Sequence, residues 1–103
     1  MSEVTATTLQ QLAVRLQDFA QQRDWSQFHS PKNLASALIV EAGELLEHFQ
    51  WLTEEQSRNL PADKKQAIAH EMADVLLYLV QIATALDVNL IEAANAKVAI
   101  NEQ

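Results

Sequence analysis

Glycine and proline are almost absent from this chain, and their scarcity limits the available folds more than any other feature. The 103 residues include one Gly and two Pro. A β-sandwich or barrel needs a turn roughly every 8–12 residues, and such turns use Gly, Pro and Asn. The abundant Ala, Leu, Gln and Glu favour helix. We therefore expect an all-α fold in a single domain covering residues 1–103.

Four helical segments are predicted from apolar spacing and capping signals. Ser30 and Pro31 provide an N-cap followed by proline at the first helical position, which marks the start of the second segment. Residues 53–56 have the form of a capping box, which predicts a short extra turn. Because short connections make neighbouring helices antiparallel, we expect a four-helix bundle-like arrangement. The expected helices span about residues 5–23, 31–52, 61–86 and 89–100.

One stretch of the third helix is apolar around almost its whole circumference. Residues 75–80 read Val-Leu-Leu-Tyr-Leu-Val. A helix that is apolar on all sides is buried on all sides. Four helices of this length cannot surround their own middle pair, so we expect a second copy of the chain to cover one apolar face. The alternative is a monomer with an unusually apolar surface.

Charge and composition exclude several classes of function. The net charge is −7, and no basic cluster exceeds the pair Lys64-Lys65. A protein that wraps a nucleic acid backbone needs a basic stripe, so no nucleic acid partner is expected. The longest uninterrupted apolar run, 75–80, is too short to span a membrane. The chain has no Cys, and its polar first eight residues do not resemble a signal peptide, so we expect a cytoplasmic protein.

The informative residues are two pairs of acids on apolar faces. Glu41 and Glu44 are spaced i, i+3 in the second helix, and Glu71 and Asp74 have the same spacing in the third. At about 100° per residue, each pair falls in a stripe that points to the bundle interior. A bare carboxylate there is costly, and like charges at this spacing repel. The apolar stripes comprise Leu34, Leu38, Leu45 and Leu52 in the second helix and Ala67, Val75, Tyr78 and Ile82 in the third.

Three explanations fit converging interior acids. A hard divalent cation would take oxygen ligands, and Mg²⁺ would keep waters for substrate phosphates. A network of bases is the second explanation, although only Lys64 and Lys65 lie near in sequence. A solvated groove is the third. Two such pairs on adjacent helices favour the metal. Gly43, the only glycine, lies between the acids of its pair, where a close approach by another helix or a ligand would justify it.

The acid pairs and their surroundings resemble the MazG-like all-α nucleoside triphosphate pyrophosphohydrolases, a group that includes the dCTP pyrophosphatases. The shared signature is ExxE, a spacer and ExxD, and 26 residues separate the two pairs here. The likeness covers roughly residues 9–101. The flanking segments that carry it are 23–25, 28–34, 47–51 and 74–79, together with a Lys-x-x-x-Asn step at Lys97 and Asn101.

The resemblance implies a reaction and a catalytic metal site. Glu41, Glu44, Glu71 and Asp74 would bind Mg²⁺, with Mn²⁺ as the alternative ion, and the metal would hold the triphosphate. A metal-activated water would attack the α-phosphorus, releasing a nucleoside monophosphate and pyrophosphate. One of the four acids or Glu47 would orient or deprotonate the water; Glu47 reads equally well as a partly solvated helix acid.

The resemblance also implies the residues that contact substrate. Aromatic rings would stack on the base, and the remaining residues would contact base or phosphate. Trp25 lies in a polar loop, where core packing does not account for a large aromatic side chain. Lys97 and Asn101 would reach phosphates in a site shared between subunits. Family members often continue with basic residues and Tyr-Pro after this step; this chain does not, and Lys32 would compensate. The implied substrate-binding set is Trp25, His29, Asn33, Trp51, Tyr78, Lys97 and Asn101.

Together these features predict a homo-oligomer, a tetramer built from dimers, that hydrolyses surplus or noncanonical nucleoside triphosphates at the α–β bond. The resemblance of the Trp25 loop to that of the dCTP-preferring members implies dCTP or a related deoxynucleotide as substrate, and the implied role is nucleotide-pool cleaning. One alternative is a non-catalytic helical interaction module. The other is a di-iron or di-manganese redox bundle, which the missing Glu-x-x-His step disfavours.

Overall fold

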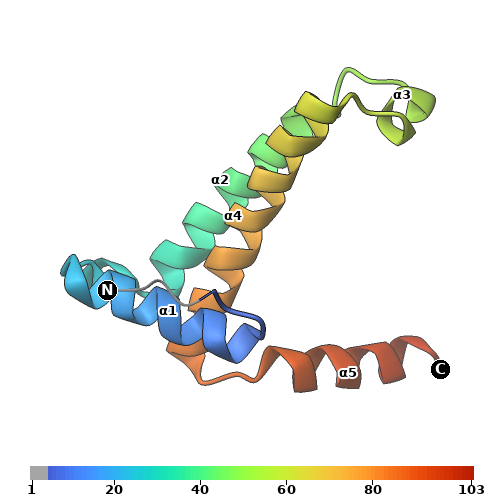
Figure 1. The fold of residues 1–103 in the computed structure, drawn as a ribbon. Helices are drawn as coiled ribbons and strands as arrows, with labels where there is room; N and C mark the ends of the chain where they lie inside the picture. The colour runs from blue at the N-terminus through green and yellow to red at the C-terminus, as the bar shows by residue number, and fades with distance from the viewer. Residues whose placement is uncertain (1–4) are drawn as a thin grey trace.

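The computed structural model describes residues 5–103, and these residues form helices and connecting loops with no strand. The all-α prediction is therefore confirmed. Figure 1 shows α2 and α4 running side by side, with α1 across one end of the pair and α3 at the other. The elements in chain order are α1 (Leu9–Gln22), the 3-10 turn η1 (Ser26–Phe28), α2 (Pro31–Glu47), α3 (Glu54–Arg58), α4 (Ala62–Leu86) and α5 (Leu90–Asn101).

The helix starts follow from short polar side chains at the N-caps. The side chains of Thr8, Ser30, Thr53 and Asn89 each accept a hydrogen bond from a backbone N–H in the first turn that follows. Each bond satisfies one of the donors that a helix start leaves without an intrahelical partner. The predicted capping box at 53–56 is present, with both reciprocal bonds. Pro31 occupies the predicted first position of α2.

Several helix boundaries differ from the sequence expectation. The first helix begins at Leu9 rather than near residue 5, because Thr8 is the threonine whose side chain caps it. The second helix ends at Glu47 rather than at residue 52, and the chain turns through 48–52 so that Thr53 can adopt the extended backbone of an N-cap. The last helix begins after Asn89 and ends at Asn101 rather than at residue 100.

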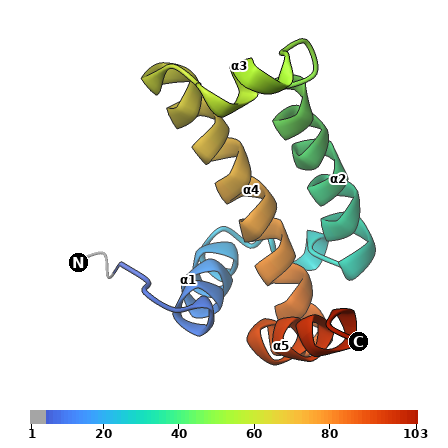
Figure 2. The same ribbon diagram turned by 90° about the vertical axis from the view of Figure 1, so that its right-hand side faces the viewer.

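The core lies where α4 packs against α2 and α1. Figure 2 shows α3 linking the far ends of α2 and α4, while α1 and α5 lie at the opposite end. Packing of α4 against α2 is the most extensive contact between helices, followed by α1 against α4. Few apolar side chains are fully buried as a result. Those below a tenth exposed in the described chain are Ala20, Leu34, Ile68, Val80 and Ala83.

The fourth long helix of the expected bundle, α5, projects from the other three instead of lying beside them (Figure 1). Residues 91–100 are exposed throughout, including Ile91, Val98 and Ile100. The physical reason is that α5 has no single apolar stripe to lay against its own chain. An isolated helix of this length is marginal in water.

The overall dimensions are large for a chain of this size. The radius of gyration is 16.1 Å, whereas about 13 Å is typical of 100 residues. The chain exposes 8116 Å², roughly 2,000 Å² more than the usual relation between mass and surface gives for a compact monomer. Exposed apolar residues on α2 and α4 supply part of this area, among them Ile39, Val40, Leu46, Met72, Leu76 and Leu79.

By length and composition alone, α4 could cross a membrane, although the sequence offered no sufficiently long uninterrupted apolar run. Core helices of soluble proteins share this property. In this structure α4 packs against α2 and α1 and carries Glu71 and Asp74 among its apolar residues.

Candidate metal and nucleotide site

The two helices of the central pair bring the predicted acids together. Glu41 and Glu44 lie on α2, and Glu71 and Asp74 lie on α4. Because each pair is spaced i, i+3, its two carboxylates share one helix face, and the acids meet at the α2–α4 contact, although Asp74 is not among the three that lie closest together. One carboxylate oxygen from each of Glu41, Glu44 and Glu71 lies within 4.8 Å of the other two. This distance is short enough for one cation to contact all three.

The converging charges leave two oxygens without partners. Glu41 Oε2 and Glu71 Oε2 are buried and accept no hydrogen bond. The neighbouring Glu44 carboxylate, then desolvation, then Glu71 raise the pKa of Glu41 from 4.5 to about 7, and Asp74 adds to the effect. Proximity of like charges favours the neutral form of Glu41. The cluster is thus an unfavourable arrangement for the protein alone.

A divalent cation fits these donors. Buried polar atoms normally have partners, so two buried oxygens without partners at the contact between α2 and α4 fit a cation there. The donors are all carboxylate oxygens, which suits Mg²⁺ or Mn²⁺. His48 and His70 are not part of this group of close donors in the described chain. The site therefore lacks the Glu-x-x-His ligands of a di-iron bundle.

A cavity of about 280 Å³ lies beside the acids. Its volume is near the lower end of the range typical of small-molecule sites. It is lined by residues from α1, α2 and α4 and by the two residues that flank η1. Five of the sequence-predicted site residues meet here: Trp25, His29, Glu41, Asp74 and Tyr78. The aromatic groups and the acids therefore share one hollow, as the sequence analysis expected.

The backbone at the end of α1 places Trp25 in this cavity. Asp24 has a left-handed conformation with φ 55°. The N–H of Trp25 donates to the carbonyl of Ala20 at 2.8 Å, and the N–H of Asp24 donates to that of Gln21 at 3.1 Å. These two bonds define a Schellman motif, which ends the helix and turns the next residue back onto it. Trp25 consequently packs against α1.

The other predicted substrate-binding residues lie outside the cavity of their own chain. Asn33 donates from its side-chain amide to the carbonyl of Phe28 at 3.0 Å, so this group braces η1 against α2. Trp51 is 86% exposed in the turn after α2. Lys97 and Asn101 lie on α5, which projects from the core. A role for the last three in this site requires a second copy of the chain.

Five residues that line the cavity were not identified as site residues in the sequence: Leu16, Phe19, Ala20, Leu77 and Gln81. Phe19 lines the cavity and is 44% exposed, although its three-residue step from Leu16 is typical of a buried helix stripe. Gln81 lines it from α4, with its amide donating to the carbonyl of Leu77 at 3.1 Å. A signal for Gln81 was available, because this polar residue follows Tyr78 by three positions and shares its helix face.

Known proteins resemble this chain in both sequence and structure. The chain is 44% identical to mouse dCTP pyrophosphatase 1 over 88 residues and 42% identical to the human protein of that name over the same length. These matches cover 84% of this chain and 52% of each relative, so the chain spans about half the length of the curated relatives it matches. A pyrophosphatase from Archaeoglobus fulgidus superposes with a TM-score of 0.86 at 33% identity, covering 99% of this chain and 95% of the other.

Residues 37–103 match the MazG-like family, and this match includes α4, α5 and both acid pairs. The chain belongs to the MazG-like family. The resemblance stated from the sequence is thereby confirmed.

Proposed function

We propose that this protein is a Mg²⁺-dependent nucleoside triphosphate pyrophosphohydrolase. It would convert a nucleoside or deoxynucleoside triphosphate and water into the monophosphate and pyrophosphate, with Mn²⁺ as an alternative ion. The observation that carries the proposal is the convergence of Glu41, Glu44 and Glu71 within 4.8 Å beside a cavity that contains Trp25 and Tyr78. The relatives named dCTP pyrophosphatase support the same reaction class.

Each side chain has a specific task in this proposal. Glu41, Glu44, Glu71 and Asp74 would hold the divalent cation, which supplies charge neutralisation for the phosphates and acidifies water when bound. The carboxylates also fix the end of the cavity where the triphosphate must lie. One of these four carboxylates or Glu47 would orient the attacking water and accept its proton.

The aromatic residues would bind the base. Trp25 and Tyr78 line the same cavity as Asp74, and stacking on such rings contributes about 1–3 kcal/mol per base. His29 is half-buried in the cavity wall and would contact the base or a phosphate. We propose dCTP or a related deoxynucleotide as the preferred substrate and cleaning of the cytoplasmic nucleotide pool as the role. Support comes from the Trp25 loop and from the names of the relatives.

We also propose that the active form is a homo-oligomer, a tetramer built from dimers. The excess surface of roughly 2,000 Å² per chain would, when buried in pairs, reach the size of an obligate interface. The exposed apolar faces of α2, α4 and α5 provide the chemistry for such an interface. A second copy would also give Lys97, Asn101 and Trp51 access to a site that they cannot reach in their own chain.

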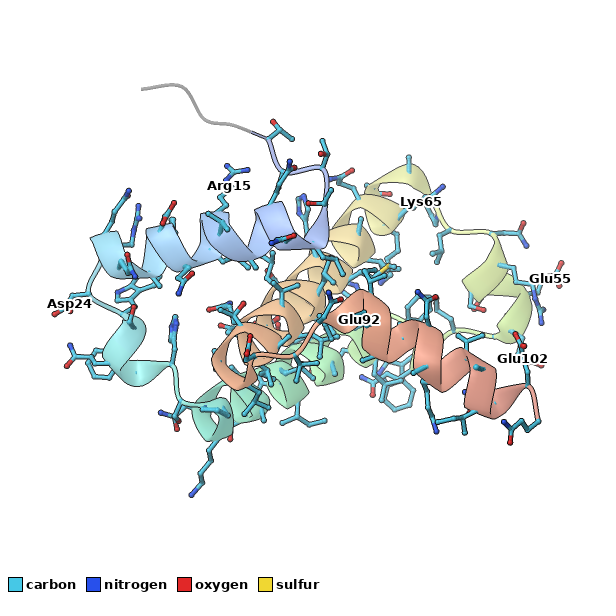
Figure 3. The ribbon with its side chains drawn as sticks, turned by 90° about the horizontal axis from the view of Figure 1, so that it is seen from below. Arg15, Asp24, Glu55, Lys65, Glu92 and Glu102 are labelled. Carbon is cyan, nitrogen blue, oxygen red and sulfur yellow. The ribbon has the colours of Figure 1, made fainter. Side chains whose placement is uncertain are left out.

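Pyrophosphate release from a panel of nucleoside triphosphates with Mg²⁺ tests the function. Glu41→Gln and Asp74→Asn remove cluster charges without changing side-chain size, and each should abolish turnover. Glu55→Gln on α3 is the matched control, because Glu55 is exposed and lies away from the cavity (Figure 3). Normal turnover in both cluster variants would refute the site. Absence of release from every triphosphate would favour the interaction module.

Light scattering at several protein concentrations tests the assembly. Ile39 is 67% exposed on α2, and Ile39→Glu should dissociate the oligomer if a second copy covers this face. Lys65→Glu serves as a control at an exposed polar position. A wild-type protein that stays monomeric and folded would refute the proposed assembly.

A further inference from the structure

Three side chains form a cluster at the end of α1: Phe19, Arg23 and Trp25. The guanidinium carbon of Arg23 lies 3.6 Å from the centroid of the Phe19 ring. The rings of Phe19 and Trp25 meet edge to face, with centroids 5.5 Å apart and planes inclined at 66°. The Arg23 guanidinium also lies 5.9 Å from the Trp25 ring. One cation thus contacts the face of the first ring and lies within interaction range of the second.

Both rings need an external restraint to keep a defined orientation. Phe19 is 44% exposed and Trp25 is 45% exposed, so core packing encloses neither. The Schellman motif fixes the backbone of Trp25 but leaves its side-chain torsions free. Stacking of a planar guanidinium on Phe19 restricts that ring, and the edge-to-face contact transmits the restriction to Trp25.

Arg23 itself is not among the residues that line the cavity, whereas Phe19 and Trp25 are. Its effect on a bound base must therefore pass through the rings. We propose that Arg23 is a positioning residue for the base pocket: its guanidinium holds Phe19, and through Phe19 holds Trp25, in the orientation that receives the base. This proposal rests on the proposed function, because it assigns the cavity to a nucleotide base.

The proposal differs from two others that the same geometry would permit. If Arg23 bound a phosphate directly, its removal would weaken binding of a triphosphate more than binding of a monophosphate. If it were only a surface residue, its removal would change neither Trp25 motion nor substrate affinity. A positioning residue weakens both nucleotides by the same factor, because the shared base is what the rings contact.

Trp25 can report on its own mobility without any nucleotide. The chain has two tryptophans, so the Trp51→Phe background leaves Trp25 as the single emitter. Time-resolved fluorescence anisotropy should show a larger nanosecond component in Arg23→Ala than in this parent, and Arg23→Lys should fall between them. Arg58→Ala is the matched control, an exposed arginine whose nearest acid is Glu54 at 4.0 Å on α3. Equal anisotropy decays in parent and Arg23→Ala would overturn the proposal.

Nucleotide binding then tests the consequence in the protein that retains Trp51, because Trp51 belongs to the proposed substrate-binding set. Arg23→Ala should raise KM for the preferred triphosphate and Kd for its monophosphate by the same factor, roughly two- to fivefold, with a smaller change in kcat. A loss confined to the triphosphate would overturn the positioning role. If the wild-type protein releases no pyrophosphate from any triphosphate, the proposed function fails, while the anisotropy of Trp25 still decides whether Arg23 restrains the ring.

Discussion

Glu41 and Glu71 face each other across the contact between α2 and α4, each with one buried oxygen that accepts no hydrogen bond. Neither helix needs an acid there for packing. The arrangement costs stability in the protein alone and becomes favourable when a cation occupies the gap. Activity and stability should therefore respond in opposite directions to changes at this contact.

Glu41→Gln should raise the melting temperature of the metal-free protein. The substitution removes the charge that Glu44 and Glu71 repel most while keeping the side-chain volume. The same change should lower the rate of pyrophosphate release at least roughly 100-fold. A ligand to the cation is lost, and with it the stabilisation that the cation gives to the charge of the transition state. Calorimetric melting in EDTA, beside the activity assay, measures both effects. A lower melting temperature in EDTA would contradict the repulsion described here.

The pH dependence of stability follows from the raised pKa of Glu41. The folded state keeps a proton on this group up to about pH 7, whereas the unfolded state releases it near 4.5. The folded state therefore binds more protons in this window, and the contribution of Glu41 to the free energy of unfolding falls as pH rises from 4.5 to 7. Urea unfolding in EDTA across this pH range should show that the free energy of unfolding of the wild type falls as pH rises. In Glu41→Gln the free energy of unfolding should depend less steeply on pH.

Divalent cations should reverse that dependence. Protons and metal compete for the same oxygens, so stabilisation by added Mg²⁺ should grow as the pH approaches 7. The measurement is the same unfolding series with and without Mg²⁺. Stabilisation by Mg²⁺ that is independent of pH, or equal in Glu41→Gln, would place the ion elsewhere.

Asp24→Gly should stabilise the protein by about 0.5–1 kcal/mol. Asp24 adopts φ 55°, a conformation that glycine occupies without the steric cost that a Cβ imposes. Asp24→Val, with a branched Cβ, should instead destabilise by about 1–2 kcal/mol and loosen the corner that places Trp25. Figure 3 shows Asp24 at this corner between α1 and η1. Urea unfolding of the two variants measures the change in the free energy of unfolding, which should rise in one variant and fall in the other. Changes of the same sign would show that backbone strain at residue 24 does not determine the stability of these variants.

The effect of Gly43→Ala distinguishes a monomer from an oligomer. A Cβ at Gly43 would meet nothing within 4 Å in the single chain, so a monomer should gain about 0.5–1 kcal/mol of helix stability. Gly43 shares a helix face with the exposed residues Ile39 and Leu46. Our account expects a second copy to pack closely there, and the added methyl should then lower the temperature at which the oligomer dissociates. Light scattering and thermal melting together distinguish the two results.

Local signals made much of this fold predictable. Ser30-Pro31 and the box at 53–56 mark helix starts because their capping groups lie within three residues of each other, and both were found as expected. The start of α1 was less predictable, because several polar residues precede Leu9 and only the structure selects Thr8 as the cap. The end of α2 at Glu47 has no glycine signal, so the sequence did not reveal it.

The acids of the site could be predicted from the sequence, whereas the other residues that line the cavity were harder to predict. Spacing i, i+3 fixes a face within one helix, so the meeting of Glu41 with Glu71 followed once α2 and α4 were taken as neighbours. Phe19 could not be recognised as a cavity residue, because apolar spacing cannot distinguish a cavity wall from a packed interior. The position of α5 could not be derived, since no element of its own chain covers it.

Mn²⁺ binding followed by electron paramagnetic resonance tests the central claim most directly, because the free ion gives a signal that is lost on binding. Wild-type protein should show a saturable site that Mg²⁺ displaces, Glu71→Gln should weaken it severely, and Glu55→Gln should leave it intact. Equal Mn²⁺ affinity in wild type and Glu71→Gln would show that the paired helices do not hold the ion.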